Sequence, residues 1–242
     1  MSELATHGIA VPGKVRVVPL AGDDWAEAWP EFFVPIAVGP RLLVVPPWMA
    51  PGADDRVTIV IDPGRGFGTG HHASTAGCLA ILTTIVERDR PARVIDLGTG
   101  SGLLAIAAAR LGVARVLAVD DDSAAIDCAI ANAARNGVAE RVHSVVADAG
   151  AIETEAAPLV VANLLSAVHT RVAARYRHLV APGGMLVLGG LLEKEAPDVT
   201  ATVEREGFVC REELTIDGWT TLVLSRSQVE QQSRDCCSTS QA

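Results

Sequence analysis

The sequence predicts an α/β protein built on a doubly wound, seven-stranded and mostly parallel β-sheet. From Arg93 onward, short apolar runs alternate with segments of helical periodicity, a pattern typical of β-α-β units with right-handed crossovers. One of these apolar runs leads into a glycine-rich turn. The last two runs have no helix between them, so we expect them to form a hairpin that makes one edge strand antiparallel.

Each element follows from its own stretch of sequence. The seven strands are expected at residues 94–97, 116–119, 142–146, 159–162, 185–188, 208–211 and 220–224. Helices are expected at residues 103–111, 124–136, about 166–180 and 195–206. Ser123 is the expected N-cap of the second of these helices and Gly137 its C′ residue. The segment Pro182-Gly183-Gly184 predicts a turn before the fifth strand.

The domain organisation is predicted from shifts in composition. Residues 1–60 read as a short N-terminal segment and linker, residues 61–225 as the main domain, and the polar residues 226–242 as a disordered tail. Within the first segment, strands are expected near residues 41–46 and 57–61. Asp23 or Asp24 is a possible cap for a short helix with Trp25, Trp29 and Phe32 on one face, and a small packing helix is the favoured interpretation.

Composition narrows the class of protein and its partners. The 242 residues are 49% hydrophobic, enough for a core, but no apolar run approaches the ~20 residues of a membrane span. Met1-Ser2-Glu3 does not begin a signal peptide. The five cysteines lack metal spacing, and buried thiols with a Cys236-Cys237 tail pair fit a reducing cytoplasm. The net charge of −9 disfavours direct binding of nucleic acid and favours a basic protein or a neutral small molecule.

The glycine-rich turn indicates a cofactor site. Gly98, Gly100 and Gly102 follow an apolar run that ends near Asp96, and Asp120 ends the next run. Glycine lets a ligand lie against the backbone, and a carboxylate at a strand end suits two ribose hydroxyls. The spacing is G-x-G-x-G rather than the dinucleotide G-x-G-x-x-G, and Asp96 would repel a phosphate while suiting an amino group and a sulfonium. S-adenosylmethionine is such a ligand, although an ordinary βα turn also explains the glycines.

Several motifs together closely resemble one known family. The residues that carry the resemblance are Asp62-Pro63-Gly64-Arg65-Gly66-Phe67-Gly68-Thr69-Gly70-His71-His72-Ala73-Ser74-Thr75, the Gly98 turn, Ala162-Asn163-Leu164, Pro182-Gly183-Gly184 and Gly189-Gly190-Leu191-Leu192. They resemble the PrmA family, the bacterial methyltransferases of ribosomal protein L11. The resemblance runs from about Asp24 to Leu224. It implies a Rossmann-like class I methyltransferase domain at residues 61–225, dependent on S-adenosylmethionine.

The same resemblance implies the site residues. The cofactor-binding positions of the family fall on Thr75, Gly98, Gly100, Asp120 and Asn163, with the first hydroxyl of the H-x-T-T element replaced by Ser74. Asn163 is also the expected catalytic residue, by positioning the methionine moiety and the incoming amine, and no general base or metal is expected.

Neighbouring residues allow further readings. Asp148 is placed to reach the adenine amine or is a solvated loop carboxylate. His71 and His72 are adjacent and have no third ligand nearby, which disfavours a metal site. Phe67 and the aromatics of residues 25–32 are candidates for the wall of the methyl-transfer cavity. The chain has Asn163-Leu164-Leu165-Ser166 where enzymes acting on planar nitrogens show [DN]-P-P-[YFW], so we expect an aliphatic amine as acceptor.

The acceptor is expected to be a lysine or N-terminal amine of a basic protein, most simply ribosomal protein L11. Family members usually carry an N-terminal recognition domain, and the roughly 22 residues before Asp23 are too few for it. The alternatives are another protein, as for the electron-transfer flavoprotein lysine methyltransferases, a small-molecule amine, or a non-catalytic binding module.

Overall fold

The computed structural model describes residues 35–49, 55–62 and 73–227. The chain divides into two compact units, residues 1–33 and residues 34–242, and all described residues belong to the second. Three predicted features lie outside the described residues: the helix around Trp25, the block with Phe67, His71 and His72, and the tail with Cys236-Cys237. The boundaries predicted at residues 60 and 225 stay predictions.

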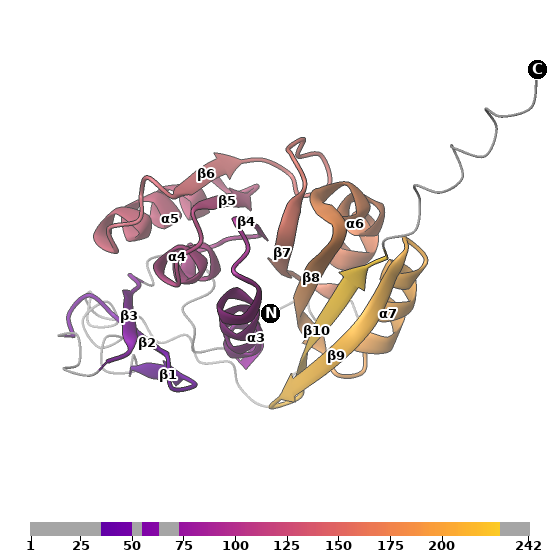
Figure 1. Ribbon diagram of the computed structural model, residues 1–242, viewed down its shortest axis with the longest axis horizontal. Coiled ribbons are helices and arrows are strands. Elements are labelled where there is room, and N and C mark those ends of the chain that lie inside the picture. Colours follow the sequence, from indigo (N-terminus) through magenta and orange to yellow (C-terminus); the bar gives the residue numbers. More distant parts are fainter. Residues whose placement is uncertain (1–34, 50–54, 63–72, 228–242) are drawn as a thin grey trace, which may run out of the picture. The chain divides into compact units, whose positions relative to one another are not determined.

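The seven-stranded sheet is confirmed, with the order β6-β5-β4-β7-β8-β10-β9 (Figure 1). The strands are β4 (Arg93–Leu97), β5 (Arg115–Asp120), β6 (Val142–Val146), β7 (Ala157–Asn163), β8 (Val180–Leu192), β9 (Phe208–Ile216) and β10 (Trp219–Arg226). Pairs between β4 and its neighbours β5 and β7 are parallel, as are β5–β6 and β7–β8. Successive strands are therefore added on one side of β4 up to β6, and on its other side from β7 onward. Doubly wound folds bind their ligands at the point between β4 and β7 where the strand order reverses.

The C-terminal hairpin supplies the antiparallel strand, as predicted, but that strand is not at the edge. Strand β10 pairs antiparallel with both β8 and β9, so it lies one position in and β9 is the edge. Helix α7 (Ala196–Glu204) connects β8 to β9. This crossover skips one position, and β10 then fills the gap by folding back along β9.

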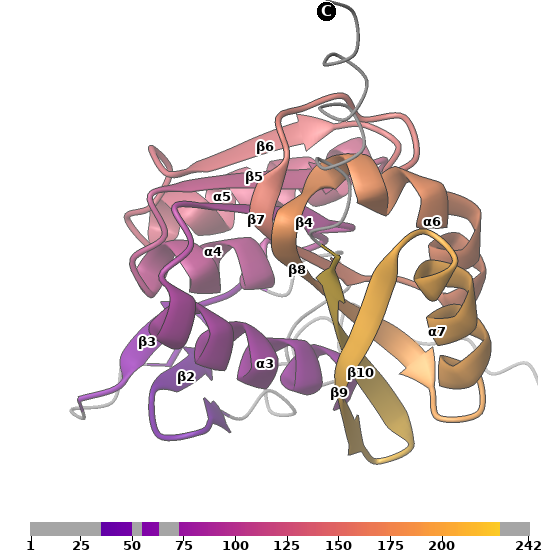
Figure 2. The same ribbon diagram turned by 45° about the vertical axis from the view of Figure 1, so that its right-hand side comes forward.

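Helices cover both faces of the sheet (Figure 2). The helices are α3 (Ala73–Asp89), α4 (Leu103–Arg110), α5 (Ser123–Arg135), α6 (Ser166–Leu179) and α7. Consecutive strand residues point to opposite faces, so Val94 joins the core under α3 and α4 while Ile95 joins the core under α6 and α7. Burial of both faces explains why the strands read as continuous apolar runs. Within residues 35–49, 55–62 and 73–227, no helix has the length and apolar character needed to span a bilayer.

Two predicted details of the sheet and helices differ from the structure. The N-cap of α5 is Asp122 rather than Ser123, because its carboxylate accepts the Ala124 N–H at 2.8 Å. Gly137 has φ 67°, as a C′ residue should. Strand β8 begins at Val180, before the predicted turn, and residues 181–184 face only Pro158 in the register with β7. The Pro-Gly-Gly segment therefore bulges the strand instead of preceding it.

A small three-stranded sheet packs on the face covered by α3 and α4. Its strands are β1 (Ile36–Val38), β2 (Leu42–Val45) and β3 (Val57–Val60), in that order. Asn132 of α5 and Asn136, the C-cap residue of the same helix, bind the outer edge of β3 through their side chains; we call them the asparagine pair. Asn136 accepts the Val60 N–H at 2.8 Å and donates to the Val60 carbonyl at 2.7 Å.

Asn132 continues this ladder toward the glycine-rich turn. Its Oδ1 accepts the Asp62 N–H at 3.0 Å, and its Nδ2 donates to the Ser101 carbonyl at 2.9 Å. The side chain is fully buried. The turn and the segment that leaves β3 are therefore fixed by the same amide group.

The described cysteines are free thiols with raised pKa values. Cys78 is fully buried, and burial raises its pKa to about 12. Cys128 and Cys210 are only half-buried, and burial raises their pKa values as well. The prediction of buried thiols is thus confirmed for Cys78 alone.

Candidate cofactor and acceptor site

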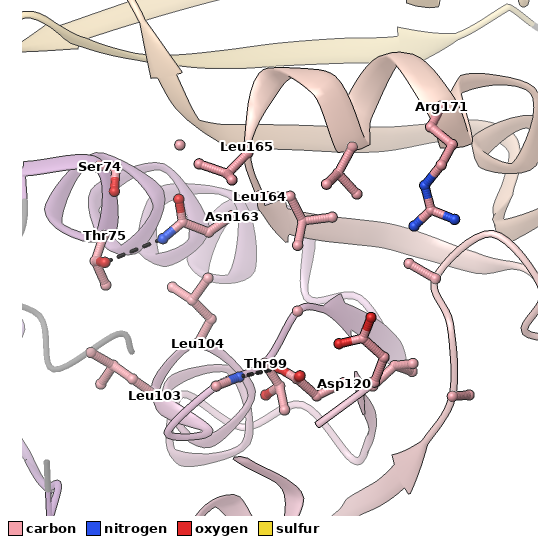
Figure 3. A pocket seen from close by; sticks show the side chains of 18 of the residues that line it. Ser74, Thr75, Thr99, Leu103, Leu104, Asp120, Asn163, Leu164, Leu165 and Arg171 are labelled. Atoms are coloured by element: carbon pink, nitrogen blue, oxygen red, sulfur yellow. Dashed lines mark hydrogen bonds between the residues drawn. The ribbon is translucent and has the colours of Figure 1, made fainter. Parts of the chain in front are cut away.

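A cavity of about 370 Å³ lies at the carboxyl ends of β4, β5 and β7 (Figure 3), a size suited to a small-molecule ligand. Figure 3 shows Thr75 and Asn163 on one side of the cavity and Asp120 on the other. All five predicted cofactor residues line it, and they come from four elements: α3, the glycine turn, β5 and β7. The residues that line the cavity are Ser74, Thr75, Gly98, Thr99, Gly100, Leu103, Leu104, Val119, Asp120, Asp121, Ala147, Ala149, Asn163, Leu164, Leu165, Val168, Arg171, Gly190 and Trp219.

The glycine-rich turn forms the floor of this cavity. Gly98, Gly100 and Gly102 have φ values of 71°, 54° and 83°, which only glycine adopts freely. Both Gly98 and Thr99 donate their N–H groups to the Val119 carbonyl, at 2.8 and 3.0 Å, and so tie the turn to β5. A Cβ on Gly98 would collide with the Leu164 side chain. Glycine is therefore favoured here by the backbone conformation, and any side chain would also displace Leu164.

Asp120 ends β5 with its carboxylate at the cavity. One oxygen accepts the Gly100 N–H at 2.9 Å and the other accepts the Asp122 N–H at 3.1 Å. Each carboxylate oxygen has a second lone pair, which leaves an acceptor on each for a ligand diol. The neighbouring Asp121 also lines the cavity and was not singled out from the sequence.

Asp96 is placed differently from its predicted role. It belongs to the same strand face as Val94 and is fully buried below the turn, outside the cavity lining. Its Oδ2 accepts the Thr99 hydroxyl at 2.7 Å and the Ala105 N–H at 3.1 Å, while its Oδ1 has no hydrogen-bond partner among the described residues. Burial raises the pKa of this carboxyl to about 7. Asp96 thus stabilises the turn and the start of α4, and it does not line the ligand cavity.

Thr75 and Asn163 meet at the opposite side of the cavity. Asn163 ends β7 and donates from Nδ2 to the Thr75 hydroxyl at 3.2 Å, which joins β7 to the first turn of α3. The Asn163 Oδ1 is buried and has no hydrogen-bond partner among the described residues. A buried acceptor without a partner is costly, and in a ligand site it marks the position of a donor on the ligand.

The loop after β6 forms a third side. Ala147 and Ala149 line the cavity, and Asp148 between them pairs with Arg171 of α6 at 2.9 Å. The Arg171 guanidinium holds the pKa of Asp148 below its usual range. Asp148, one candidate for reaching an adenine amine, therefore lies next to the cavity and forms an ion pair with Arg171.

Arg171 and Trp219 also line the cavity, although neither was predicted from the sequence as a site residue. Trp219 follows Asp217-Gly218, a hairpin-turn signal, at the start of an antiparallel strand. Such a strand begins at the edge where its parallel neighbours end, which places Trp219 beside the site. That argument was available from the sequence. The pairing of Arg171 with Asp148, 23 residues away, had no signal.

Strand order, glycine turn and cavity together define the class I methyltransferase fold. The chain also matches the family described as "Ribosomal protein L11 methyltransferase (PrmA)" over residues 2–227. It therefore belongs to the PrmA family, as the resemblance of its motifs indicated.

Individual relatives agree with this assignment. A ribosomal protein L11 methyltransferase of Sorangium cellulosum is 40% identical over 194 residues, and one of Heliobacterium modesticaldum is 41% identical over 209 residues. These matches cover 78% and 86% of this chain but 60% and 65% of the relatives, so the chain spans less than two thirds of their length. The crystal structure of a ribosomal protein L11 methylase from Lactobacillus delbrueckii superposes with a TM-score of 0.73 at 27% identity, covering 80% of this chain and 98% of that one.

Proposed function

We propose that the chain is an S-adenosylmethionine-dependent N-methyltransferase that modifies lysine or N-terminal amines of ribosomal protein L11. The observation that supports this most directly is the arrangement of one cavity, with the Asp120 carboxylate on one side and the Thr75–Asn163 pair on the other. Such a cavity suits an elongated ligand with a diol near one end and an amino acid group near the other.

The residues present fit this cofactor. Asp120 offers acceptors for the ribose hydroxyls, and the partnerless Oδ1 of Asn163 is an acceptor for the ligand's amino group. Thr75, in the first turn of α3, would hold the carboxylate with its hydroxyl and backbone amide. Gly98 and Gly100 would leave space along the turn. The bound cofactor supplies the methyl group, carried on a positively charged sulfur.

The chain's own task is orientation and exclusion of water. Leu103, Leu104, Leu164 and Val168 line the cavity with apolar groups, so few water molecules compete with the acceptor. The amine must arrive neutral, since only a neutral amine has the lone pair that attacks the methyl group. An apolar surrounding favours that neutral form. Asn163 would then hold the amine and the methionine moiety in line.

The acceptor follows from the family and from the local sequence. The relatives are named ribosomal protein L11 methyltransferases, and Leu164-Leu165 after Asn163 supply no rigid aromatic clamp for a planar nitrogen. A lysine side chain or chain terminus fits better. The net charge of −9 also favours a basic substrate over nucleic acid. We place the reaction in the cytoplasm, where ribosomal proteins are made.

The test combines binding and transfer. Isothermal titration should show one site for S-adenosylmethionine, and incubation with labelled cofactor and purified L11 should label the protein at amines. An Asp120→Ala variant is the loss-of-binding control, and Asp127→Asn, an exposed carboxylate on α5, is its matched neutral control. A parallel incubation uses cell lysate: label in another protein or only in small molecules, with purified L11 unlabelled, would reject L11 as substrate, and absence of cofactor binding would reject the enzyme class.

A further inference from the structure

His169 is a buried histidine for which the proposed reaction gives no role. It lies on α6, is fully buried, and contacts polar groups through both ring nitrogens. Its Nδ1 lies 2.7 Å from the Tyr176 hydroxyl and its Nε2 lies 2.8 Å from the Gly189 carbonyl. A carbonyl oxygen only accepts, so Nε2 carries the proton and Nδ1 accepts the tyrosine O–H. The contacts thus specify a single tautomer.

The carbonyl that His169 binds belongs to the strand beside Asn163. Gly189 of β8 is the register partner of Asn163 of β7, and its carbonyl also accepts the Leu164 N–H at 3.2 Å. A Cβ on Gly189 would stand 3.0 Å from the Asn163 Oδ1. His169 therefore contacts the backbone of the residue that neighbours Asn163 and Leu164, both of which line the cavity.

These bonds form one connected path to the cavity. Tyr176 donates to His169, and the Gly189 carbonyl accepts from both His169 and the Leu164 N–H. Asn163, the neighbour of Leu164 and the register partner of Gly189, donates to Thr75. Next to it, a Cβ on Gly190 would collide with the Leu164 backbone, so the two strand ends are in close contact. A shift of the Gly189 peptide would displace Asn163 and Leu164 together.

We propose that His169 is a positioning residue: its Nε2–H to the Gly189 carbonyl fixes the Asn163 side chain in the orientation that the acceptor amine requires. The expected effect on kcat rests on the proposed function, whereas the expected effect on the Asn163 side chain does not. Burial lowers the pKa of His169 to about 4, so the ring stays neutral, with one donor and one acceptor, at the pH where the enzyme works.

Two substitutions separate this role from simple packing. In His169→Gln the longer side chain can place an amide N–H where Nε2 stands, whereas the shorter His169→Asn cannot reach the Gly189 carbonyl. We expect His169→Asn to lower kcat by roughly 10- to 100-fold, with the Kd for S-adenosylmethionine changed less than about threefold. His169→Gln should recover most of that loss. His178→Asn, an exposed histidine of the same helix, is the matched control.

Nuclear magnetic resonance provides the readout that does not need activity. Long-range ¹H–¹⁵N correlations on the wild-type protein should show the Nε2–H tautomer of His169, and the Asn163 side-chain amide signals should move in His169→Asn but not in His169→Gln. An Nδ1–H tautomer, unmoved Asn163 signals, or equal kcat in the two variants would overturn the proposal. If His169→Asn does not fold, Tyr176→Phe replaces it: the Nε2–H tautomer should persist there because the Gly189 carbonyl still accepts that proton, and a change to Nδ1–H would overturn the proposal. A wild-type protein without transferase activity would refute the proposed function while these spectra still decide the positioning role.

Discussion

Replacing Asp96 with asparagine should stabilise the protein in a way that depends on pH. In the folded state burial raises the carboxyl pKa from 3.8 to about 7, so the folded state holds the proton where the unfolded state has already lost it. The contribution of Asp96 to the free energy of unfolding is fully present below pH 4. It is lost as the pH rises through the folded-state pKa of about 7. The pKa difference corresponds to roughly 4 kcal/mol above pH 7. Asparagine keeps an acceptor for Thr99 and Ala105 and carries no charge.

The measurement compares the two proteins by urea unfolding at pH 5 and pH 8.5. Integrating the two titrations, the advantage of Asp96→Asn should be roughly 2.5 kcal/mol larger at pH 8.5 than at pH 5. Any cost of burying the amide N–H groups is the same at both pH values. His169, whose lowered pKa reduces stability below about pH 6.5, is present in both proteins and cancels. Asp127→Asn should show no such difference. An advantage independent of pH would refute the assignment of Asp96 as a buried carboxyl with a raised pKa.

Three further substitutions test the cavity. Asp120→Ala should weaken S-adenosylmethionine binding by about 1–3 kcal/mol, since a charged acceptor for the diol is lost; unchanged affinity by titration calorimetry would exclude Asp120 as the ribose ligand. Asn163→Ala should reduce kcat more than cofactor affinity, and equal losses would make it a simple binding residue. Gly98→Ala should cost at least about 1–2 kcal/mol of folding stability, because the residue has a positive φ. It should also weaken cofactor binding, because the new side chain displaces Leu164. Normal stability and affinity would show that the turn tolerates a side chain.

The sheet was predictable because its central strands, β4 and β7 above all, are buried on both faces. Such strands appear as apolar runs, and the helices between them have recognisable ends, as at Gly137. The position of β10 was not predictable from those runs, since a hairpin alone does not say on which side of β9 it folds. The early start of β8 was also missed, because Pro182-Gly183-Gly184 is a turn signal that the sheet accommodates as a bulge.

The cavity residues were predictable where a strand end carried them. Asp120 and Asn163 follow apolar runs, and parallel strands bring their carboxyl ends together. Asp96 follows the same rule and still faces away, because the alternation of side chains along β4 turns it toward α4. His169 was not recognised as special: Tyr176, seven residues later, shares its helix face, but no spacing in the sequence connects the pair to Gly189 of the next strand.

The asparagine pair of α5 has a consequence for association between chains. Strand β3 is the edge of the small sheet, and an open edge offers N–H and carbonyl groups on which a second chain can add a strand. Alternate residues of β3 direct these groups outward, and at Val60 and Asp62 they are already bonded to Asn136 and Asn132. Two side chains therefore bond the backbone groups that a neighbouring strand would otherwise bond. This edge presents few free groups on which another chain could add a strand and aggregate.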